Sequence, residues 1–505
     1  MVKLLKNTPY GFVFELENND PHFTEEYEIY INEELYRKTN KNVVSIFGLK
    51  PDTNYSFDIK NYKFEIKTLK PSFVINIKDY GATGDGVTND SSKINAALYC
   101  ALDGATIYIP KGTYLVDQIF LRSNIGIYIE KGATIVQNPN RAELAILKGY
   151  ERDYDHTSAD SNASWEGHPL DCYCSLIYGK NVENVHIYGD GEINGNGDIS
   201  GFWDSPKIKN IAFRPRNITL NQCERITISG ITSKNSACWN IHPYYCTNVS
   251  FFDLHIESIE ESPNTDGLNP ESCHNVEIIG CAFTVGDDCI AIKSGEYYMS
   301  KKHLRPTKNV VVRNCYMQKG HGAIVLGSEI ACGVYDVKIM QCYFEGTDRG
   351  LRVKTRRGRG KDSIVDNISF DNVVMDGVTH CFVVNMFYFC DPDGKSDYVR
   401  NKNVTTMDEQ TPTVKNIIVT NLIAKNIKGS AVFIYGLPEN KVQNIVMKNN
   451  NIHFADQRIN EVPAMMEDVE IIENLGVFIT NGTNVIIENT NFEGTHNNII
   501  EGVKQ

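Results

Sequence analysis

The sequence predicts an all-β fold: a right-handed parallel β-helix of about ten coils, preceded by a small N-terminal β-sandwich. After residue 104 the chain consists of short apolar runs bounded by Gly, Asn or Asp, and little helical periodicity is present. A motif of the form Asn-Val-x-Ile recurs there, with closest spacings of 23, 27, 27 and 28 residues. Three short strands with three turns need about that length, whereas one propeller blade needs ~40–45 residues.

The recurring motif marks the start of each coil. If each period forms one turn of a solenoid, residues at equal distances from these anchors stack in register, ~4.8 Å apart per coil. Residues distant in sequence then become neighbours on one wall. The motif begins at Asn184, Arg225, Asn248, Asn275, Asn309, Asp336, Asn367, Asn416, Asn444 and Asn484.

Residues 1–68 form a separate unit, followed by a linker at 69–72 and the β-helix domain at 73–505. Alternating apolar residues predict five strands in this unit, at 12–16, 27–31, 44–46, 55–59 and 64–66. Its segment Leu49-Lys-Pro-Asp-Thr-Asn-Tyr55 resembles the corner of fibronectin type III modules, in which the tyrosine hydroxyl holds a loop. The alternative is a β-extension without a function of its own.

The β-helix domain opens with a strand, a glycine-rich loop and a helix. Asp90 or Ser91 can cap this helix, and Ile94, Ala97 and Leu98 give it one apolar stripe. Because terminal repeats of a solenoid need a cap, we expect the helix to cover its end. The stretch resembles the entry of the pectate-lyase-like β-helix superfamily, which implies the fold and leaves the activity open.

Composition limits the class of protein. The 505 residues are 41% hydrophobic and 22% charged, as in soluble globular proteins, and no apolar run approaches the length of a membrane span. The first residues lack the apolar core of a signal peptide, so a cytoplasmic location is expected, where the 14 cysteines stay reduced. A net charge of −13 argues against nucleic acid as a partner. No cofactor or metal is predicted.

Four short motifs carry the candidate chemistry. Counted from their anchors, Asp287 and Asp288 fall at offsets 12 and 13, and His321 falls at offset 12 of the next coil. Asp266 and Lys354 share offset 18, with Arg352 at 16 and His242 at 17, which predicts one lateral wall. The motifs are Asn264-Thr-Asp-Gly267, Gly286-Asp-Asp288, Gly320-His-Gly322 and Arg352-Val-Lys354.

Three crowded carboxylates suit glycoside hydrolysis. Crowding raises the pKa of at least one, which supplies a protonated acid beside ionised bases. Asp287 and Asp288 can both reach a cleft only at a bend, which Gly286 permits. Three aspartates could instead hold Ca²⁺, but the cations Arg352 and Lys354 share the wall, and they repel a metal and attract an anionic sugar.

Cationic and polar residues near these motifs are candidates for binding a sugar carboxylate. Seven basic residues and no acid lie between Arg349 and Lys361, and guanidinium groups suit carboxylates. The outer arginines are equally compatible with a solvated turn, and Lys293 with an exposed lysine on a core strand. The further substrate-binding candidates are Asn240, His242, Lys293 and Arg357.

Together, the four motifs resemble those of glycoside hydrolase family 28, the polygalacturonases. The resemblance covers residues 73 to about 495, with Arg-Val-Lys where the family usually has Arg-Ile-Lys. It implies hydrolysis of α-1,4-linked galacturonate with inversion and without a cofactor. Asp287 would be the general acid, Asp266 and Asp288 would activate water, and His321 would tune the acid. Arg352 and Lys354 would bind the sugar carboxylate, and Asn264 would position the motif.

Long insertions affect whether the substrate-binding groove is open at both ends. They are predicted at Pro139–Asp171, Ser294–Pro306 and Cys381–Thr411, and they are rich in aromatic and charged residues, as binding loops are. With the small N-terminal domain, they resemble the bacterial exo-acting branch of the family. The hypothesis is exo-hydrolysis of oligogalacturonides from the non-reducing end. Alternatives are a rhamnogalacturonan or xylogalacturonan hydrolase, a Ca²⁺-dependent pectate lyase, or a non-catalytic polysaccharide-binding β-helix.

Overall fold

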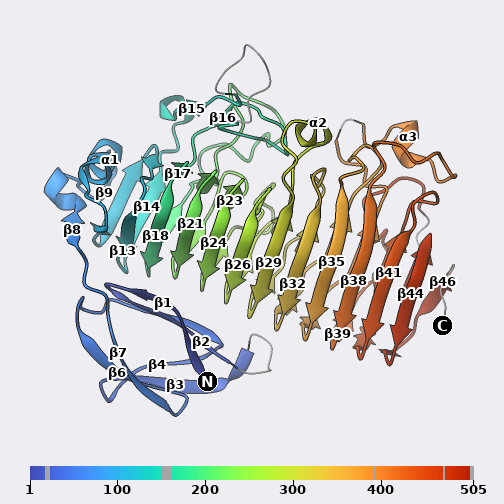
Figure 1. Ribbon diagram of the computed structural model, residues 1–505, viewed down its shortest axis with the longest axis horizontal. Helices are drawn as coiled ribbons and strands as arrows, with labels where there is room; N and C mark the ends of the chain where they lie inside the picture. Colours follow the sequence, from blue (N-terminus) through green and yellow to red (C-terminus); the bar gives the residue numbers. More distant parts are fainter. Residues whose placement is uncertain (18–22, 151–160, 392, 470–472, 501–505) are drawn as a thin grey trace.

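A computed structural model describes residues 1–17, 23–150, 161–391, 393–469 and 473–500. Two long parallel sheets and an interrupted third sheet run side by side along the molecule, so that the chain winds as a parallel β-helix (Figure 1). Their inward residues form one continuous apolar core along the solenoid. The predicted right-handed parallel β-helix with a small N-terminal β-domain is confirmed.

Within the described residues the first two sheets have thirteen strands each. The first contains β8 (Phe73–Asn76), β10 (Ala105–Ile109), β13 (Ile125–Ile129), β18 (Glu183–Gly189), β21 (Glu224–Ser229), β24 (Thr247–Phe252), β26 (His274–Ile279), β29 (Thr307–Arg313), β32 (Val334–Met340), β35 (Ile364–Asp371), β38 (Thr413–Thr420), β41 (Val442–Lys448) and β44 (Gly482–Glu488). The second contains β9 (Asp85–Asn89), β11 (Gly112–Val116), β14 (Ala133–Gln137), β19 (Glu192–Asn194), β22 (Thr232–Lys234), β25 (His255–Glu257), β27 (Ala282–Thr284), β30 (Tyr316–Gln318), β33 (Tyr343–Glu345), β36 (Val374–Asp376), β39 (Ile423–Ile427), β42 (Asn451–Phe454) and β45 (Asn491–Glu493).

The third sheet is divided into a four-stranded and a seven-stranded part. The first part contains β12 (Ile119–Phe120), β17 (Ile177–Lys180), β20 (Ile218–Asn221) and β23 (Ile241–Tyr244). The second contains β28 (Asp288–Ile292), β31 (Gly322–Leu326), β34 (Arg349–Lys354), β37 (His380–Asn385), β40 (Val432–Tyr435), β43 (Leu475–Thr480) and β46 (Asn497–Ile500). Leu268 bridges the two parts by pairing with Ile241 on one side and Ile290 on the other.

The anchor motif recurs because each coil needs a left-handed residue at the same corner. All ten anchors have φ between 54° and 59°, a conformation that asparagine tolerates best after glycine. Their side chains also form a ladder, in which Asn275 donates to Asn248 at 2.8 Å and Asn309 donates to Asn275 at 3.0 Å. The expected ten coils are too few because β8, β10 and β13 precede Asn184. Asn124, with φ of 61°, already takes the anchor position before β13 and accepts a hydrogen bond from Asn184 at 2.7 Å.

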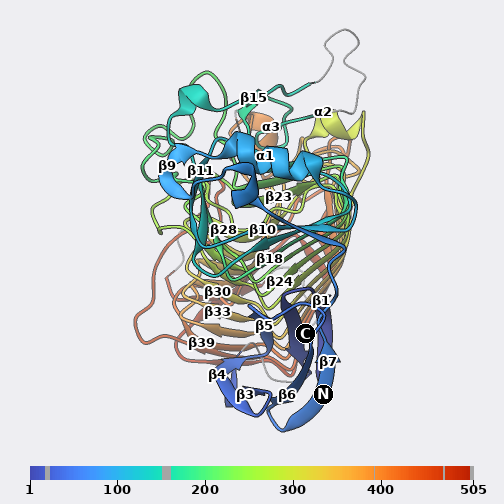
Figure 2. The ribbon, with the colours of Figure 1, turned by 90° about the vertical axis from the view of Figure 1, so that its left-hand side faces the viewer.

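The predicted capping helix is confirmed as α1 (Ser91–Cys100), which lies across the N-terminal end of the solenoid (Figure 2). Its residues Ile94, Ala97 and Leu98 are buried in the solenoid core. Asp90 precedes the helix, but its carboxylate accepts hydrogen bonds from the backbone N–H groups of Thr83 and Gly84 rather than capping the helix. Asp90 thereby closes the glycine-rich loop onto the helix.

The N-terminal unit has two antiparallel sheets, β1-β2-β5 and β4-β3-β6-β7, around a shared apolar core. The five predicted strands are present, whereas β1 and β4 were missed because apolar and polar residues do not alternate regularly in their sequences. The backbone N–H of Lys50 donates to the Tyr55 hydroxyl at 2.8 Å, as expected of the corner motif. Membership of the fibronectin type III class stays a prediction. The strands are β1 (Val2–Thr8), β2 (Gly11–Leu16), β3 (Phe23–Ile31), β4 (Glu34–Lys41), β5 (Val43–Phe47), β6 (Asn54–Ile59) and β7 (Tyr62–Lys67).

This unit packs on the outer face of the first sheet. Tyr10 stacks on Tyr128 with ring centroids 4.3 Å apart, beside a small apolar cluster shared by the two units. Glu15 receives two hydrogen bonds from the Arg313 guanidinium, at 2.6 and 2.8 Å, and both side chains are largely buried. A bidentate pair of this kind fixes orientation, so the N-terminal unit is a docked part of the structure.

The remaining elements lie in the connections between sheets. They are η1 (Ile77–Tyr80), η2 (Arg141–Glu143), β15 (Ile146–Leu147), β16 (Cys172–Tyr173), α2 (Tyr297–Ser300) and α3 (Asp397–Arg400). The insertion predicted to begin at Cys381 begins only after Asn385, because β37 continues to that residue. Part of the insertion predicted at Pro139–Asp171 lies outside the described residues. No helix among the described residues is long and apolar enough to cross a membrane.

The Glu15–Arg313 pair yields a stability prediction. Glu15→Gln leaves a buried guanidinium without its counter-charge, and we expect the free energy of unfolding to fall by about 3 kcal/mol. Urea denaturation followed by circular dichroism measures the change. Glu17→Gln, on the same segment but exposed, is the matched control. Equal midpoints for the two variants would show that the ion pair does not hold the units together.

Candidate active site

The catalytic candidates lie where the third sheet is divided. The backbone N–H of Gly267 donates to the carbonyl of Asp288 at 2.9 Å, which places Asp266 beside Asp288 on neighbouring rungs. Counting offsets had instead aligned Asp266 with Lys354. That alignment is wrong because the turn at 259–264 lengthens this coil before Asp266.

The two adjacent aspartates stand at a bend, as expected, but Gly286 has a different role from the one predicted. Its φ is not in the left-handed region. A Cβ at this position would lie 2.4 Å from the Ser262 carbonyl oxygen and 2.8 Å from that of Glu260. Gly286 is therefore needed for the close approach of the preceding coil. The N–H of Asp288 donates to the Asp287 carboxylate at 3.0 Å, which fixes the bend locally.

Asp288 is held ionised by two cations from β34. The Lys354 ammonium donates to its Oδ2 at 2.7 Å, and an Arg352 nitrogen lies 3.7 Å from Oδ1. Burial alone would raise the pKa of Asp288, but these two charges outweigh it and keep the pKa at about 2. Gly322, on the intervening strand, leaves room for this pair, since a Cβ there would lie 3.1 Å from Oδ1.

The other two aspartates are shifted in the opposite direction. Burial, reinforced by the charges of Asp287 and Asp288, raises the pKa of Asp266 well above its ordinary value. Asn269 donates to Asp266 Oδ2 at 2.6 Å. Burial and the neighbouring Asp288 likewise raise the pKa of Asp287, which receives a hydrogen bond from Asn264 at 3.5 Å. One ionised carboxylate thus stands beside two that favour protonation.

His321 follows Asp287 one rung later. Its backbone N–H donates to the Asp287 carbonyl at 3.1 Å, and its Nδ1 lies 2.8 Å from Asp348 Oδ2. This hydrogen bond, opposed by burial and aided by the nearby aspartates, raises the pKa of His321. The imidazole is the most accessible group of the wall, with 57% of its side chain exposed.

The chain is similar to known glycoside hydrolases in sequence and in fold. Residues 102–470 match the family described as glycosyl hydrolases family 28. The chain belongs to glycosyl hydrolase family 28. A probable polygalacturonase of Vitis vinifera is 30% identical over 412 residues, covering 79% of this chain and 78% of that protein.

Solved structures agree with the family assignment. A hyperthermoactive exopolygalacturonase from Thermotoga maritima is 26% identical with a TM-score of 0.66, covering 83% of this chain and 92% of that one. A family 28 exopolygalacturonase from Yersinia enterocolitica has a TM-score of 0.70 and covers 99% of this chain and 98% of its own. At 19% identity the second likeness shows the fold alone.

Four of the predicted substrate-binding residues are buried and bonded to other parts of the chain. Arg357 is fully buried, and its guanidinium bonds to Glu439 and to loop carbonyls. Lys293 bonds to Glu329 at 2.8 Å. Asn240 donates to the carbonyl of Asp266 at 3.2 Å, which braces that aspartate from behind. Each of these three side chains thus has a partner within the protein, and its contact with substrate stays a prediction.

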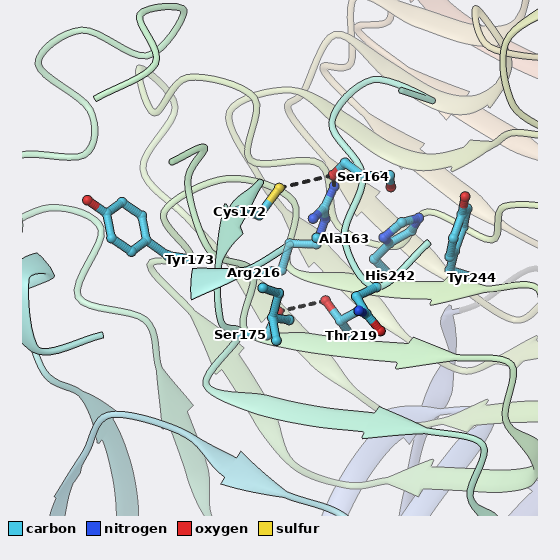
Figure 3. A pocket seen from close by; sticks show the side chains of 11 residues that line it. Ala163, Ser164, Cys172, Tyr173, Ser175, Arg216, Thr219, His242 and Tyr244 are labelled. Carbon is cyan, nitrogen blue, oxygen red and sulfur yellow. Dashed lines mark hydrogen bonds between the residues drawn. The ribbon is translucent and has the colours of Figure 1, made fainter. Parts of the chain in front are cut away.

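His242 is likewise enclosed. It bonds to Glu271 at 2.8 Å and borders a cavity of only about 10 Å³ beneath the segment Asn162–Ser164 (Figure 3). Such a space suits one water molecule and excludes a sugar. In this structure a segment of the first insertion encloses His242, and its contact with substrate stays a prediction.

Sequence reasoning missed several residues that contact the predicted ones, among them Asp348 and Arg214. Asp348 orients His321, and Arg214 donates to Asn264 Oδ1 at 2.6 Å. The signal for Asp348 was present, since it lies 27 residues after His321, close to one coil, and its N–H bonds to Gly320 of the preceding rung. Arg214 lies in an insertion without a motif, so its position could not be read from the repeat.

The charge balance at Asp288 is testable. Removing the ammonium in Lys354→Met should raise the pKa of Asp288 by about one to three units. If Asp288 must be ionised for hydrolysis, the acidic limb of kcat/KM for polygalacturonate moves to higher pH by the same amount. Lys361→Met, which removes an exposed lysine paired with Glu409, should leave the limb in place. An unmoved limb in Lys354→Met would exclude Asp288 as the base.

Proposed function

We propose that this family 28 hydrolase cleaves α-1,4 bonds of galacturonan and oligogalacturonides with inversion, acting from the non-reducing end. The observation that carries the proposal is the pairing of a partly exposed carboxyl of raised pKa, Asp287, with an ionised neighbour, Asp288. Glycoside hydrolysis needs one carboxyl that donates a proton and one that accepts a proton from water.

In the proposed mechanism Asp287 protonates the leaving glycosidic oxygen. Asp288 accepts the proton of the attacking water, since it is ionised over the whole physiological range. Asp266 has a raised pKa in the free chain, so we assign it to orienting that water through a hydrogen bond rather than to deprotonating it. His321, whose pKa is raised by its hydrogen bond to Asp348, follows Asp287 on the next rung, and Arg352 and Lys354 attract the sugar carboxylate.

Segments on both sides of the aspartates support exo action. On one side Arg216 donates to the Ser164 carbonyl at 2.6 Å and Tyr178 to that of Asn162 at 3.2 Å, so the first insertion covers the first part of the third sheet. On the other side Arg349 donates to the Pro463 carbonyl at 3.2 Å, and Asn385 to that of Met465 at 3.1 Å.

These two covers flank the rungs of Asp288 and His321. An uncovered third sheet would let a polymer chain lie across many rungs, whereas covers on both sides favour entry of a chain end. His168 of the first cover stacks on Tyr298 of α2 with centroids 5.8 Å apart, which ties two insertions together. The 26% identity with the Thermotoga maritima exopolygalacturonase also favours this mode.

The acid assignment is tested by Asp287→Asn, which keeps the shape of the side chain and removes its proton-donating carboxyl. We expect kcat on trigalacturonate to fall by about 10³-fold while KM changes little. Proton NMR of the first product of the unaltered enzyme reports the anomeric configuration, and inversion is expected. Unchanged kcat in the variant would exclude Asp287 as the acid. Ultraviolet-absorbing products lost on adding a chelator would instead indicate a lyase.

The exo mode is tested on hexagalacturonate labelled at its reducing end. Trimming from the other end should give labelled products that shorten stepwise by one or two units, in order of time. Simultaneous early appearance of labelled fragments of every length would overturn exo action and leave the hydrolase assignment intact. Chromatography with fluorescence detection resolves the two patterns.

A further inference from the structure

We propose that a cationic cavity beside the active site binds the carboxylate of a second uronate residue of the substrate, at least one sugar away from the cleaved bond. This inference rests on the proposed function and deepens it. The cavity lies within the connection between β19 and β20, which sequence reasoning did not recognise as an insertion. Its volume is about 470 Å³, within the range of small-ligand sites.

The lining of this cavity suits an anionic sugar. Arg141, Lys209 and Arg214 contribute three positive charges, against one negative charge from Asp204. Local positive charge is notable in a chain with a net charge of −13, and guanidinium and ammonium groups bind carboxylates well. The Arg141 guanidinium lies 4.5 Å from the ring centroid of buried Phe202, which helps to hold this charge at the cavity.

A chain of hydrogen bonds connects this cavity to the catalytic acid. Arg214 is 5% exposed, lines the cavity and donates to Asn264 Oδ1 at 2.6 Å. Asn264 in turn donates to Asp287 Oδ2 at 3.5 Å. Arg214 also bonds to the carbonyls of Ala237 and Pro263, so its guanidinium is held in place. A uronate bound in the cavity would therefore lie one side chain away from Asn264.

Arg214 has a structural role as well, so its substitution would not isolate ligand binding. Lys209 is the better probe, because it is exposed at the cavity and makes no contact with the catalytic groups. Lys207 is the matched control, being a lysine of the same segment, also exposed, that does not line the cavity. Arg141→Gln combined with Lys209→Gln removes two charges and leaves Arg214 in place.

The experiment compares kcat/KM on digalacturonate and trigalacturonate at low ionic strength. Lys209→Gln should lower the value for trigalacturonate about threefold, and the double variant about tenfold, with digalacturonate little changed. Lys207→Gln should resemble the unaltered enzyme. Equal effects of Lys209→Gln on both substrates, or none on either, would overturn the cavity assignment. Thermal unfolding of the double variant checks that its fold is kept.

Calorimetry with the Asp287→Asn variant separates this inference from the proposed function. Trigalacturonate should bind more tightly than digalacturonate, and adding Lys209→Gln should remove most of that difference. If the unaltered enzyme cleaves neither oligosaccharide but binding still depends on Lys209, the cavity inference stands and the proposed activity fails. If the enzyme cleaves both oligosaccharides but binding does not depend on Lys209, the proposed activity stands and the cavity inference fails.

Discussion

The whole active site is positioned by the in-register pairing of each coil with the next coil. A parallel ladder of strands fixes every side chain along the axis to within one rung, ~4.8 Å, and leaves turns as the sole place where spacing changes. The ten left-handed anchors set that register at one corner, because the backbone near the start of each of their strands needs a residue that tolerates positive φ. Val185, Ile226, Val249 and Val276 follow successive anchors and pair in sequence. The catalytic residues lie at the third sheet, and the same register gives them regular spacing along the axis.

That regularity explains how much of the architecture was predictable. The anchors revealed the solenoid, and the apolar stripe of α1 revealed its cap, because both follow from local backbone and packing requirements. Ten coils were expected because the anchors were counted from Asn184, although Asn124 takes the same position in the coil of β13, with φ of 61° and a hydrogen bond from Asn184 at 2.7 Å. Strands β1 and β4 were missed because apolar and polar residues do not alternate regularly in their sequences. Offsets placed His321 beside Asp287 correctly, but they failed for Asp266, where a longer turn shifts the count.

Side-chain partners were less predictable than positions on the coil. Arg357 and Arg352 look alike in sequence, yet one anchors a loop through Glu439 and the other faces Asp288. His242 matches a wall position, but an insertion folds over it. In both cases the deciding contact comes from a segment distant in sequence and outside the repeat. Ion pairs between such segments cannot be derived from a period, because the period carries no information about loops.

Short connections between the second and third sheets carry the catalytic residues, and longer connections between the same sheets surround the substrate-binding space. Asp287, His321 and Asp348 all lie in this type of connection on successive rungs, and so do Arg214 and the cavity around Lys209. The short connections hold the reacting groups at fixed spacing, since both of their ends are tied into sheets. Long connections at the same corner can grow without moving the aspartates, because each coil is hydrogen-bonded independently to its neighbours. An enzyme built in this way can change the length of substrate it accepts while keeping one carboxyl of lowered pKa and one of raised pKa in place.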